Sequence, residues 1–169
     1  MDTHRPESET SRQLVLKAWA HLAVGEMAAF SEYLDVNVHW RVIGADFLPN
    51  DGRFPSKAIV MQDLLGMSVW DYAQYKMTIT RTYADGPHVV LEFVVDAKTK
   101  DGRRYPNAEY AVVVKVKNAL IVEVREYVDG IRARNALSVD RTSTATNQVS
   151  QKKNDGCQDS ASRPRPDRM

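Results

Sequence analysis

Three carboxylates stand in otherwise apolar stretches whose pattern is typical of β-strands: Glu126, Glu92 and Asp96. Side chains alternate between the two faces of a strand, so Glu92 and Asp96 share one face of residues 88–97. A carboxyl group in apolar surroundings has a raised pKa and can act as a general acid or base near neutral pH. Two such groups that face one cavity can divide the acid and base roles. The sequence therefore predicts Glu126, with Asp96 or Glu92, as catalytic residues.

Glu126 is the one acid on an apolar stripe of the last predicted strand, which consists of every second residue: Leu120, Val122, Val124, Glu126 and Val128. Glu92 has a structural alternative, because a basic residue across the sheet, Arg125 or Lys115, can pair with it. The faces of these strands can also be reversed, which takes the acids away from a cavity. The catalytic interpretation thus depends on which face of the sheet each acid takes.

Four aromatic residues are candidates for the walls of a substrate pocket: Trp19, Trp40, Trp70 and Tyr110. Trp40 is the best of them, because it alternates with Val38 and Val42 on the side of its strand that we expect to face inward. Each of these side chains buries a large area, and an ordinary place in the hydrophobic core is the alternative for every one. The expected ligand is a small apolar molecule.

The sequence lacks the motifs of several other kinds of catalytic and binding site. The one cysteine, Cys157, excludes an intrachain disulfide and a cysteine-ligated zinc site. No two histidines have the spacing of a His-x-x-x-His metal motif, and neither a Gly-x-Ser-x-Gly nucleophile motif nor a glycine-rich phosphate loop is present. We therefore expect neither a metal nor a cofactor.

The apolar periodicity places these residues on a mixed set of elements. A helical spacing predicts helices over residues 11–25, 26–34 and 57–65, with a short helix at 131–137. Alternation and apolar runs bounded by turns predict strands over residues 36–42, 75–83, 88–97, 108–117 and 120–127. The run at 88–97 is nearly all apolar, as in a strand that is covered on both faces.

This order of elements predicts an α+β fold. Strands joined by tight turns after the helices favour a curved antiparallel sheet wrapped around the N-terminal helices, an α+β roll of the cystatin-like kind, over a parallel sheet. Such an arrangement encloses a cone-shaped cavity suited to a small molecule. We also expect a homodimer, because the exposed face of the sheet is apolar.

Charge divides the chain into a body and an extension. The net charge of +1 results from 23 basic and 22 acidic side chains. These are unevenly distributed, because residues 141–169 hold six basic and three acidic side chains. We predict a polar leader at 1–10, one domain at 11–138 and a disordered basic tail at 139–169. The charge balance of the chain gives no overall electrostatic attraction to nucleic acid or to an anionic membrane surface, so we expect neither as a partner. The polar N-terminus and the absence of a long apolar run favour a soluble, cytoplasmic protein.

Several segments in order resemble the SnoaL-like family of the nuclear-transport-factor-2-like superfamily, whose relatives include ketosteroid isomerases and limonene epoxide hydrolase. The resemblance covers about residues 11–135 and implies the α+β roll described above. It is carried by Gly25-Glu26 at the end of the first helix, by the run from Tyr33 to Trp40, by Gly52-Arg53-Phe54 before Lys57-Ala58-Ile59, and by the run from Ile121 to Asp129.

The resemblance also tests the activities of these relatives. The carboxylate base of ketosteroid isomerases falls on Trp40, and their oxyanion-hole residues fall near Ala18 or Trp19 and near Val112, so that mechanism is not expected here. The Arg-x-Asp motif of the epoxide hydrolase falls on Val94 and Asp96, which keeps the acid and loses the arginine. Its second acid falls on Glu126.

Two functions remain open at this stage. The first is a cofactor-independent isomerase, cyclase or hydrolase that uses pocket carboxylates on an apolar substrate of polyketide, terpenoid or steroid type. The second is a non-catalytic ligand-binding or dimerisation module of the same fold.

Overall fold

The computed structural model describes residues 4–66 and 69–137, which belong to one compact unit that ends at Ser138. The predicted basic tail at 139–169 lies outside the described residues. The helices and short helical turns are α1 (His4–Ala23), α2 (Met27–Ser31), η1 (Pro49–Gly52), α3 (Lys57–Ile59), η2 (Val60–Leu65), η3 (Tyr72–Gln74) and α4 (Gly130–Leu137). η2 is a turn of π-helix that continues α3.

The N-terminal helix is longer than its apolar stripe indicates. We expected a leader at 1–10, but α1 begins at His4. Polar contacts hold these first turns, since Arg12 donates two hydrogen bonds to the Glu9 carboxylate (2.9 and 2.7 Å) and Gln13 donates a third (2.9 Å). Side-chain pairs three and four residues apart stabilise this part of the helix, which lies before the apolar stripe, and such polar pairs do not appear in the hydrophobic periodicity.

The strands form one sheet. They are β1 (Leu34–Ile43), β2 (Arg53–Phe54), β3 (Lys76–Asp85), β4 (His88–Lys98), β5 (Arg104–Lys117) and β6 (Leu120–Val128). Their order is β2-β1-β6-β5-β4-β3, and every neighbouring pair is antiparallel except β1 and β6. The predicted strands are confirmed within a few residues of their ends, whereas the two-residue strand β2 has too short a pattern to be recognised in the sequence.

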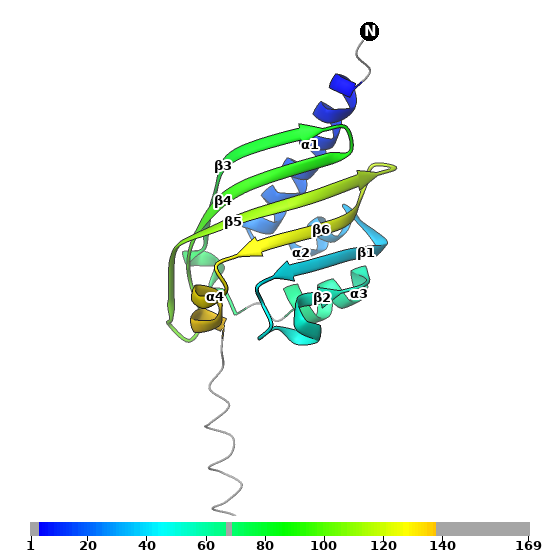
Figure 1. Ribbon diagram of the computed structural model, residues 1–169. Helices are drawn as coiled ribbons and strands as arrows, with labels where there is room; N and C mark the ends of the chain where they lie inside the picture. Colours follow the sequence, from blue (N-terminus) through cyan, green and yellow to red (C-terminus); the bar gives the residue numbers. More distant parts are fainter. Residues whose placement is uncertain (1–3, 67–68, 138–169) are drawn as a thin grey trace, which may run out of the picture. The chain divides into compact units, whose positions relative to one another are not determined.

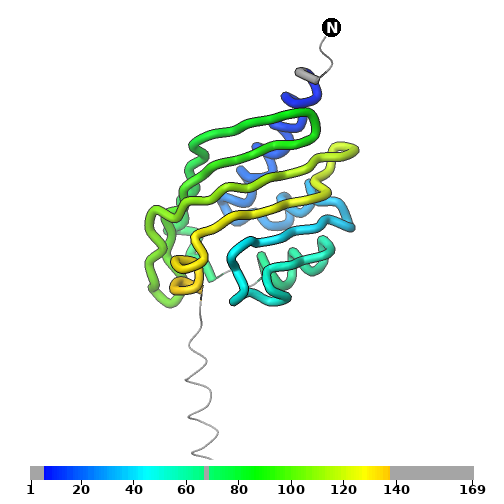
Figure 2. The backbone as a smooth tube through the Cα atoms, in the orientation of Figure 1, coloured from blue at the N-terminus to red at the C-terminus, as the bar shows by residue number. Residues whose placement is uncertain are grey.

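The sheet is curved and does not close. Figures 1 and 2 show β5 starting beside α4, bending and then running the whole width of the sheet. The register between β4 and β5 shifts between Val95 and Ala97, and the register between β3 and β4 shifts between Ile79 and Arg81. Bulges of this kind bend a sheet and increase its twist. The predicted α+β roll is confirmed.

Helices α1, α2 and α3 lie on one face of this sheet, which we call the inner face (Figure 1). Packed between the helices and the inner face is a core of apolar side chains, including Val15, Trp19, Phe30, Val38, Leu91, Val112 and Val124. Burial alternates strictly along β4, where Val89, Leu91, Phe93 and Val95 are buried and the residues between them are not. The strand period of two therefore assigns each residue of this strand to a face.

The other side of the sheet, the outer face, is apolar at its centre. Val90, Val94, Ala111 and Val113 are half-buried there, and Tyr83 and Tyr127 are exposed at 52% and 41%. Figure 1 shows no helix over this face. The nearly continuous apolar run of β4 suggested a strand covered on both faces, but within the described residues only its inner face is covered.

No helix among residues 4–66 and 69–137 is long and apolar enough to cross a membrane.

Candidate functional site

Glu126 projects from β6 onto the inner face of the sheet. It pairs in register with Val42 of β1 and with Val112 of β5, both of which are buried. A register shift near the start of β6 puts Ile121 in the core, so the predicted stripe holds only from Val124 onward. The side chain of Glu126 lies deep in the protein and still keeps part of its surface accessible.

The partner of this carboxylate is an indole. Trp40 Nε1 donates a hydrogen bond of 2.9 Å to Glu126 Oε2. The parallel register of β1 and β6 explains the contact, because Trp40 lies opposite Val124, one step along the inner face from Glu126. The ring plane of Trp40 stacks on Trp19 of α1 at a centroid distance of 6.0 Å and an angle of 18°. The helix layer thus fixes the donor that holds the carboxylate.

Burial raises the pKa of Glu126 to about 7, and the bond from Trp40 opposes this rise. Desolvation disfavours the charged carboxylate, while a donor to that carboxylate favours it. Within residues 4–66 and 69–137, no cationic side chain contributes to the pKa shift. Glu126 is therefore divided between its acid and base forms near neutral pH, which is the range in which one group can both give and take a proton.

Three tyrosines stand near this carboxyl group: Tyr75 between η3 and β3, and Tyr105 and Tyr110 on β5. The hydroxyl groups of Tyr105 and Tyr110 are 3.0 Å apart and share a hydrogen bond. Because only one hydroxyl can donate in that bond, the hydrogen of the other is left for a different acceptor. Tyr110 also stacks on Phe93, with ring centroids 4.9 Å apart.

The pKa of each of these tyrosines is raised. Burial is the largest cause for all three, and the negative charge of Glu126 contributes to each rise. The hydroxyl groups consequently stay protonated at neutral pH and remain hydrogen-bond donors. Since the charge of Glu126 acts on all three rings, the carboxyl group and the tyrosines form one electrostatic unit, which we call the Glu126 site.

Trp70 adds a further aromatic wall. It lies 5.2 Å from Tyr105 and 6.0 Å from Tyr75 between ring centroids, and part of its surface is accessible. A β-bridge between Trp70 and Thr99 positions it, together with a hydrogen bond of 2.9 Å from the Asp71 N–H to the Lys98 carbonyl. The aromatic wall is thus attached to the turn between β4 and β5.

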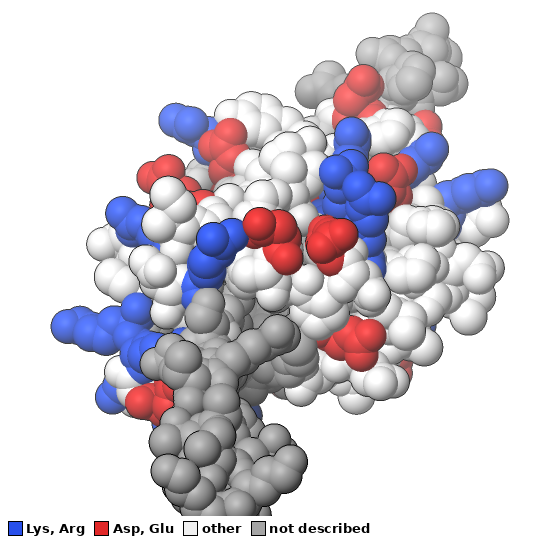
Figure 3. Space-filling model, turned by 60° about the horizontal axis from the view of Figure 1, so that its bottom comes forward, with Lys and Arg blue, Asp and Glu red and all other residues white. Residues whose placement is uncertain are grey.

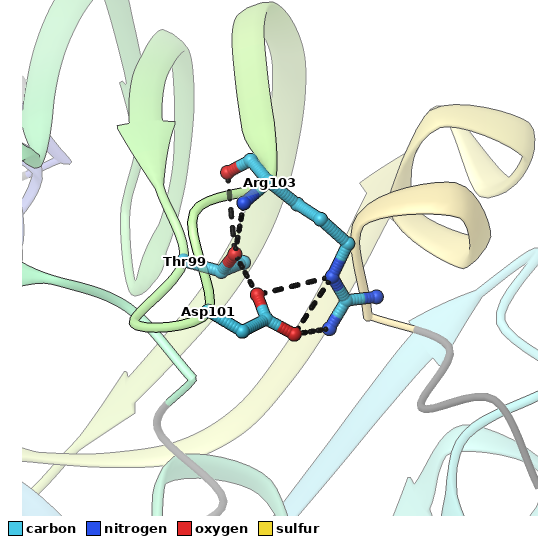
Figure 4. A network of polar contacts seen from close by, with 3 residues as sticks. All are labelled: Thr99, Asp101 and Arg103. Atoms are coloured by element: carbon cyan, nitrogen blue, oxygen red, sulfur yellow. Dashed lines mark hydrogen bonds and ion pairs between the residues drawn. The ribbon is translucent and has the colours of Figure 1, made fainter. Parts of the chain in front are cut away.

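That turn is held by a small polar network (Figure 4). The buried Thr99 hydroxyl accepts a hydrogen bond from the Arg103 N–H (2.8 Å) and donates one to Asp101. Arg103 forms an ion pair with Asp101 at 2.8 Å. Hydrogen bonds from Arg103 and Thr99 lower the pKa of Asp101 to about 2. The network fixes the turn on which Trp70 rests.

The structure does not bring the other two predicted acids to Glu126. Glu92 lies on the outer face and pairs with Arg81 of β3 at 3.4 Å. This is the ion-pair alternative, but the partner is neither Arg125 nor Lys115, the two basic residues that the sequence suggested. Asp96 is exposed, and its carboxylate accepts a hydrogen bond of 2.9 Å from the Asn107 N–H. The two acids share a strand face as expected, but that face points away from the helices.

The predicted aromatic residues divide into two groups. Trp19 is 1% exposed and belongs to the core, where it supports Trp40. Trp40 is 3% exposed and touches the carboxyl group directly, as a hydrogen-bond donor rather than only as a wall. Trp70 and Tyr110 keep accessible surface beside the Glu126 site.

Tyr75 and Tyr105 were not among the candidates. Tyr75 has the same parity as Met77 and Ile79, whose side chains pack against the core, so its inward direction was readable from the sequence. Tyr105 was hidden because Pro106 and Asn107, the latter at φ 48°, interrupt the strand pattern just after it. β5 nevertheless begins at Arg104 and carries Tyr105 to the buried side.

Helix α4 closes the end of the sheet at which β6 finishes. Asp129 caps it by accepting hydrogen bonds from the Ile131 and Arg132 N–H groups, both at 3.1 Å. Arg132 reaches the Pro106 and Asn107 carbonyls of β5, at 3.0 and 3.2 Å. Asp129 and Arg132 both act on the pKa of Tyr105. They form the charged rim nearest to the Glu126 site.

No group of three or more histidine, cysteine or acidic side chains gathers in a metal-binding arrangement in the described part of the chain. Figure 3 views the protein from the end at which α4 lies. Basic and acidic side chains are interspersed over the described part of this face. A face of this kind has no single-sign field to attract a polyanion.

Comparisons with known proteins identify the fold. No family model and no curated protein matches the chain. Among solved structures, Bal32a from a soil-derived mobile gene cassette is 18% identical, with a TM-score of 0.66 over 78% of this chain and 99% of that chain. A nuclear-transport-factor-2-like protein from Burkholderia pseudomallei is 13% identical, with a TM-score of 0.66 over 77% and 98%. A proposed isomerase from Bacillus subtilis is 20% identical, with a TM-score of 0.62 over 77% and 94%.

Proposed function

We propose that this chain, which has the nuclear-transport-factor-2-like fold, is a cofactor-independent acid–base enzyme that acts on a small, largely apolar molecule. The observation that carries the proposal is Glu126, a carboxyl group on an apolar sheet face with a pKa of about 7, accessible surface and no cationic partner among the described residues. A group of this kind can carry out the proton transfers of an isomerase, a cyclase or a hydrolase. The solved structure of a proposed isomerase with the same fold is consistent with this class.

Each group of the Glu126 site has a role in this proposal. Glu126 takes a proton from the substrate or gives one to it. The hydroxyl hydrogen that the pair Tyr105–Tyr110 does not use internally donates to a substrate oxygen, where negative charge develops. Trp40 is a positioning residue, because its N–H occupies Oε2 and leaves Oε1 for the proton transfer.

The alternative is a module of the same fold that binds a ligand without converting it.

A general base can be detected without knowing the natural substrate, because 5-nitrobenzisoxazole opens when a base removes its ring C–H proton. The electron pair of that C–H bond forms the nitrile as the N–O bond breaks, and the phenolate product is coloured. The reaction needs only a base in an apolar environment.

We expect the unmodified chain to open this probe at a rate that rises with pH and levels off above about pH 7, the pKa of Glu126. Glu126→Gln is expected to lower the rate by about 100-fold, the lower end of the range for a general base. Glu92→Gln is the matched control, because it removes a carboxylate from the outer face. Equal rates for Glu126→Gln and the unmodified chain would leave the binding module as the better account.

A further inference from the structure

The charge balance of the Glu126 site has a consequence for the ligand. A carboxylate inside a protein is normally neutralised by an arginine, a lysine or a set of hydrogen bonds. Glu126 has one donor, the Trp40 indole, and none of the ion pairs formed by the described residues includes it. When ionised, it is a negative charge whose counter-charge the described residues do not supply.

Aromatic rings stand around this carboxylate in place of a cation. Trp70, Tyr75 and Tyr110 each keep accessible surface. The ring centroids are 6.0 Å apart between Trp70 and Tyr75, 5.2 Å between Trp70 and Tyr105, and 6.5 Å between Tyr105 and Tyr110, so these rings form one continuous wall. The face of an aromatic ring carries partial negative charge and attracts cations, most strongly for tryptophan. Carboxylate and ring faces therefore favour the same sign of ligand charge.

We propose that the Glu126 site binds an organic cation, a molecule in which a protonated or quaternary nitrogen is attached to an apolar body. The nitrogen would lie against the Glu126 carboxylate, and the groups attached to it would lie against Trp70, Tyr75 and Tyr110. A compact inorganic cation is disfavoured, because these rings cannot replace its hydration shell and the described residues gather no group of three or more metal-ligating side chains. An anionic ligand would meet the charge of Glu126 at close range.

This inference deepens the proposed function, since it concerns the substrate class of the same site. Glu126 can act as an acid or as a base while its pKa lies near neutrality. A bound cation favours the ionised carboxylate and lowers its pKa. The role that remains is that of the base, which accepts a proton from the cation or from a carbon near the charged nitrogen.

The other charged and titratable groups at the site do not supply the same pH dependence. Tyr75, Tyr105 and Tyr110 have pKa values raised further above their ordinary value, so they remain neutral throughout the range of interest. Asp129 and Arg132 at the start of α4 pair with one another at 3.3 Å. Trp40 of β1 and Trp19 of α1 do not titrate. Glu126 is thus the group whose ionisation controls the binding of a cation near pH 7.

The test compares two ligands of the same shape, benzyltrimethylammonium and its uncharged carbon analogue neopentylbenzene, by calorimetry on the full chain. With a pKa of about 7, the ionised fraction of Glu126 rises from about 3% at pH 5.5 to about 97% at pH 8.5. We expect the affinity for the cation to rise about 30-fold over this interval, and the affinity for the neutral analogue not to rise.

Two variants, each with a control on the outer face, separate the effect of charge from that of shape. Glu126→Gln is expected to remove the pH dependence and to lower cation affinity at pH 8.5 at least 10-fold, whereas Glu92→Gln on the outer face leaves both unchanged. Trp70→Leu is expected to lower the affinity for the cation more than the affinity for the neutral analogue. Tyr83→Leu, which removes an exposed ring on the outer face, is its control.

The proposal is overturned if the cation binds no more tightly than neopentylbenzene at pH 8.5, or if its affinity does not rise with pH. The pH series on the unmodified chain decides this even if a variant does not fold. If opening of 5-nitrobenzisoxazole depends on Glu126 but the cation does not bind better than neopentylbenzene, the proposed ligand class is refuted and the acid–base function stands. Cation binding with this pH dependence, but without base catalysis, refutes the function and keeps the ligand class.

Discussion

Replacing Trp40 with phenylalanine tests how the Glu126 carboxyl group is tuned. The variant keeps an aromatic ring against Trp19. It removes the N–H that donates a hydrogen bond of 2.9 Å to Glu126 Oε2. That bond lowers the pKa of Glu126 against the effect of burial. Without it the ionised form loses its donor, so the pKa must rise.

The magnitude follows from the strength of the bond. A hydrogen bond to a charged group contributes about 1.5–3 kcal/mol, and one pKa unit corresponds to about 1.4 kcal/mol, so a full loss raises the pKa by about one to two units. Glu126 keeps accessible surface, and water can replace part of the lost donation. We therefore expect a rise of about one unit, from about 7 to about 8.

The measurement is a pH titration of the glutamate side-chain carboxyl carbons by NMR, with the resonance of Glu126 assigned from its absence in Glu126→Gln. Trp19→Phe is the matched control, because it removes an indole from the same stack without removing a bond to the carboxylate. An unchanged or lowered pKa in Trp40→Phe, or an equal rise in Trp19→Phe, would refute the account of the bond given above.

Two further predictions concern stability and assembly. Because the pKa of Glu126 is raised from 4.5 to about 7 on folding, the contribution of Glu126 to the free energy of unfolding falls by about 3 kcal/mol as pH rises across that interval. Glu126→Gln lacks this fall, so urea unfolding should find it the more stable protein at pH 8; parallel pH curves would contradict this. We also propose a homodimer through the outer face: light scattering at micromolar concentration should give twice the chain mass, and Val113→Asp should give the monomer mass. A monomeric unmodified chain excludes that dimer.

The architecture was predictable because it depends on local periodicity. Apolar alternation in residues 36–42 and 75–83, and turn residues such as Asn118, determine strands and hairpins almost independently of the rest of the chain. Even the direction of Trp40 followed from its parity with Val38 and Val42. Glu126 was predictable for the same reason, as the single acid on an apolar stripe.

The remainder of the site depends on contacts between distant segments, which parity does not determine. Glu92 has the same sequence signal as Glu126, an acid in an apolar strand, but the opposite face of the sheet. Only the packing of α1 and α2 decides which face is inner. The bond from Trp40 to Glu126 likewise depends on the parallel register between the first long strand and the last. No pattern within either strand encodes that register.

The parallel pairing of β1 with β6 also determines when the site can exist during synthesis. The donor and the acceptor of the Trp40–Glu126 bond are separated by 86 positions in the chain. A ribosome must therefore complete almost the whole sheet before the strand that carries Glu126 can pair with β1. Until then the edge of β1 that will pair with β6 lacks its hydrogen-bonding neighbour. An unpaired edge of this kind is prone to mispairing with other chains. The carboxyl group that gives the site its chemistry thus arrives on the strand that completes the sheet.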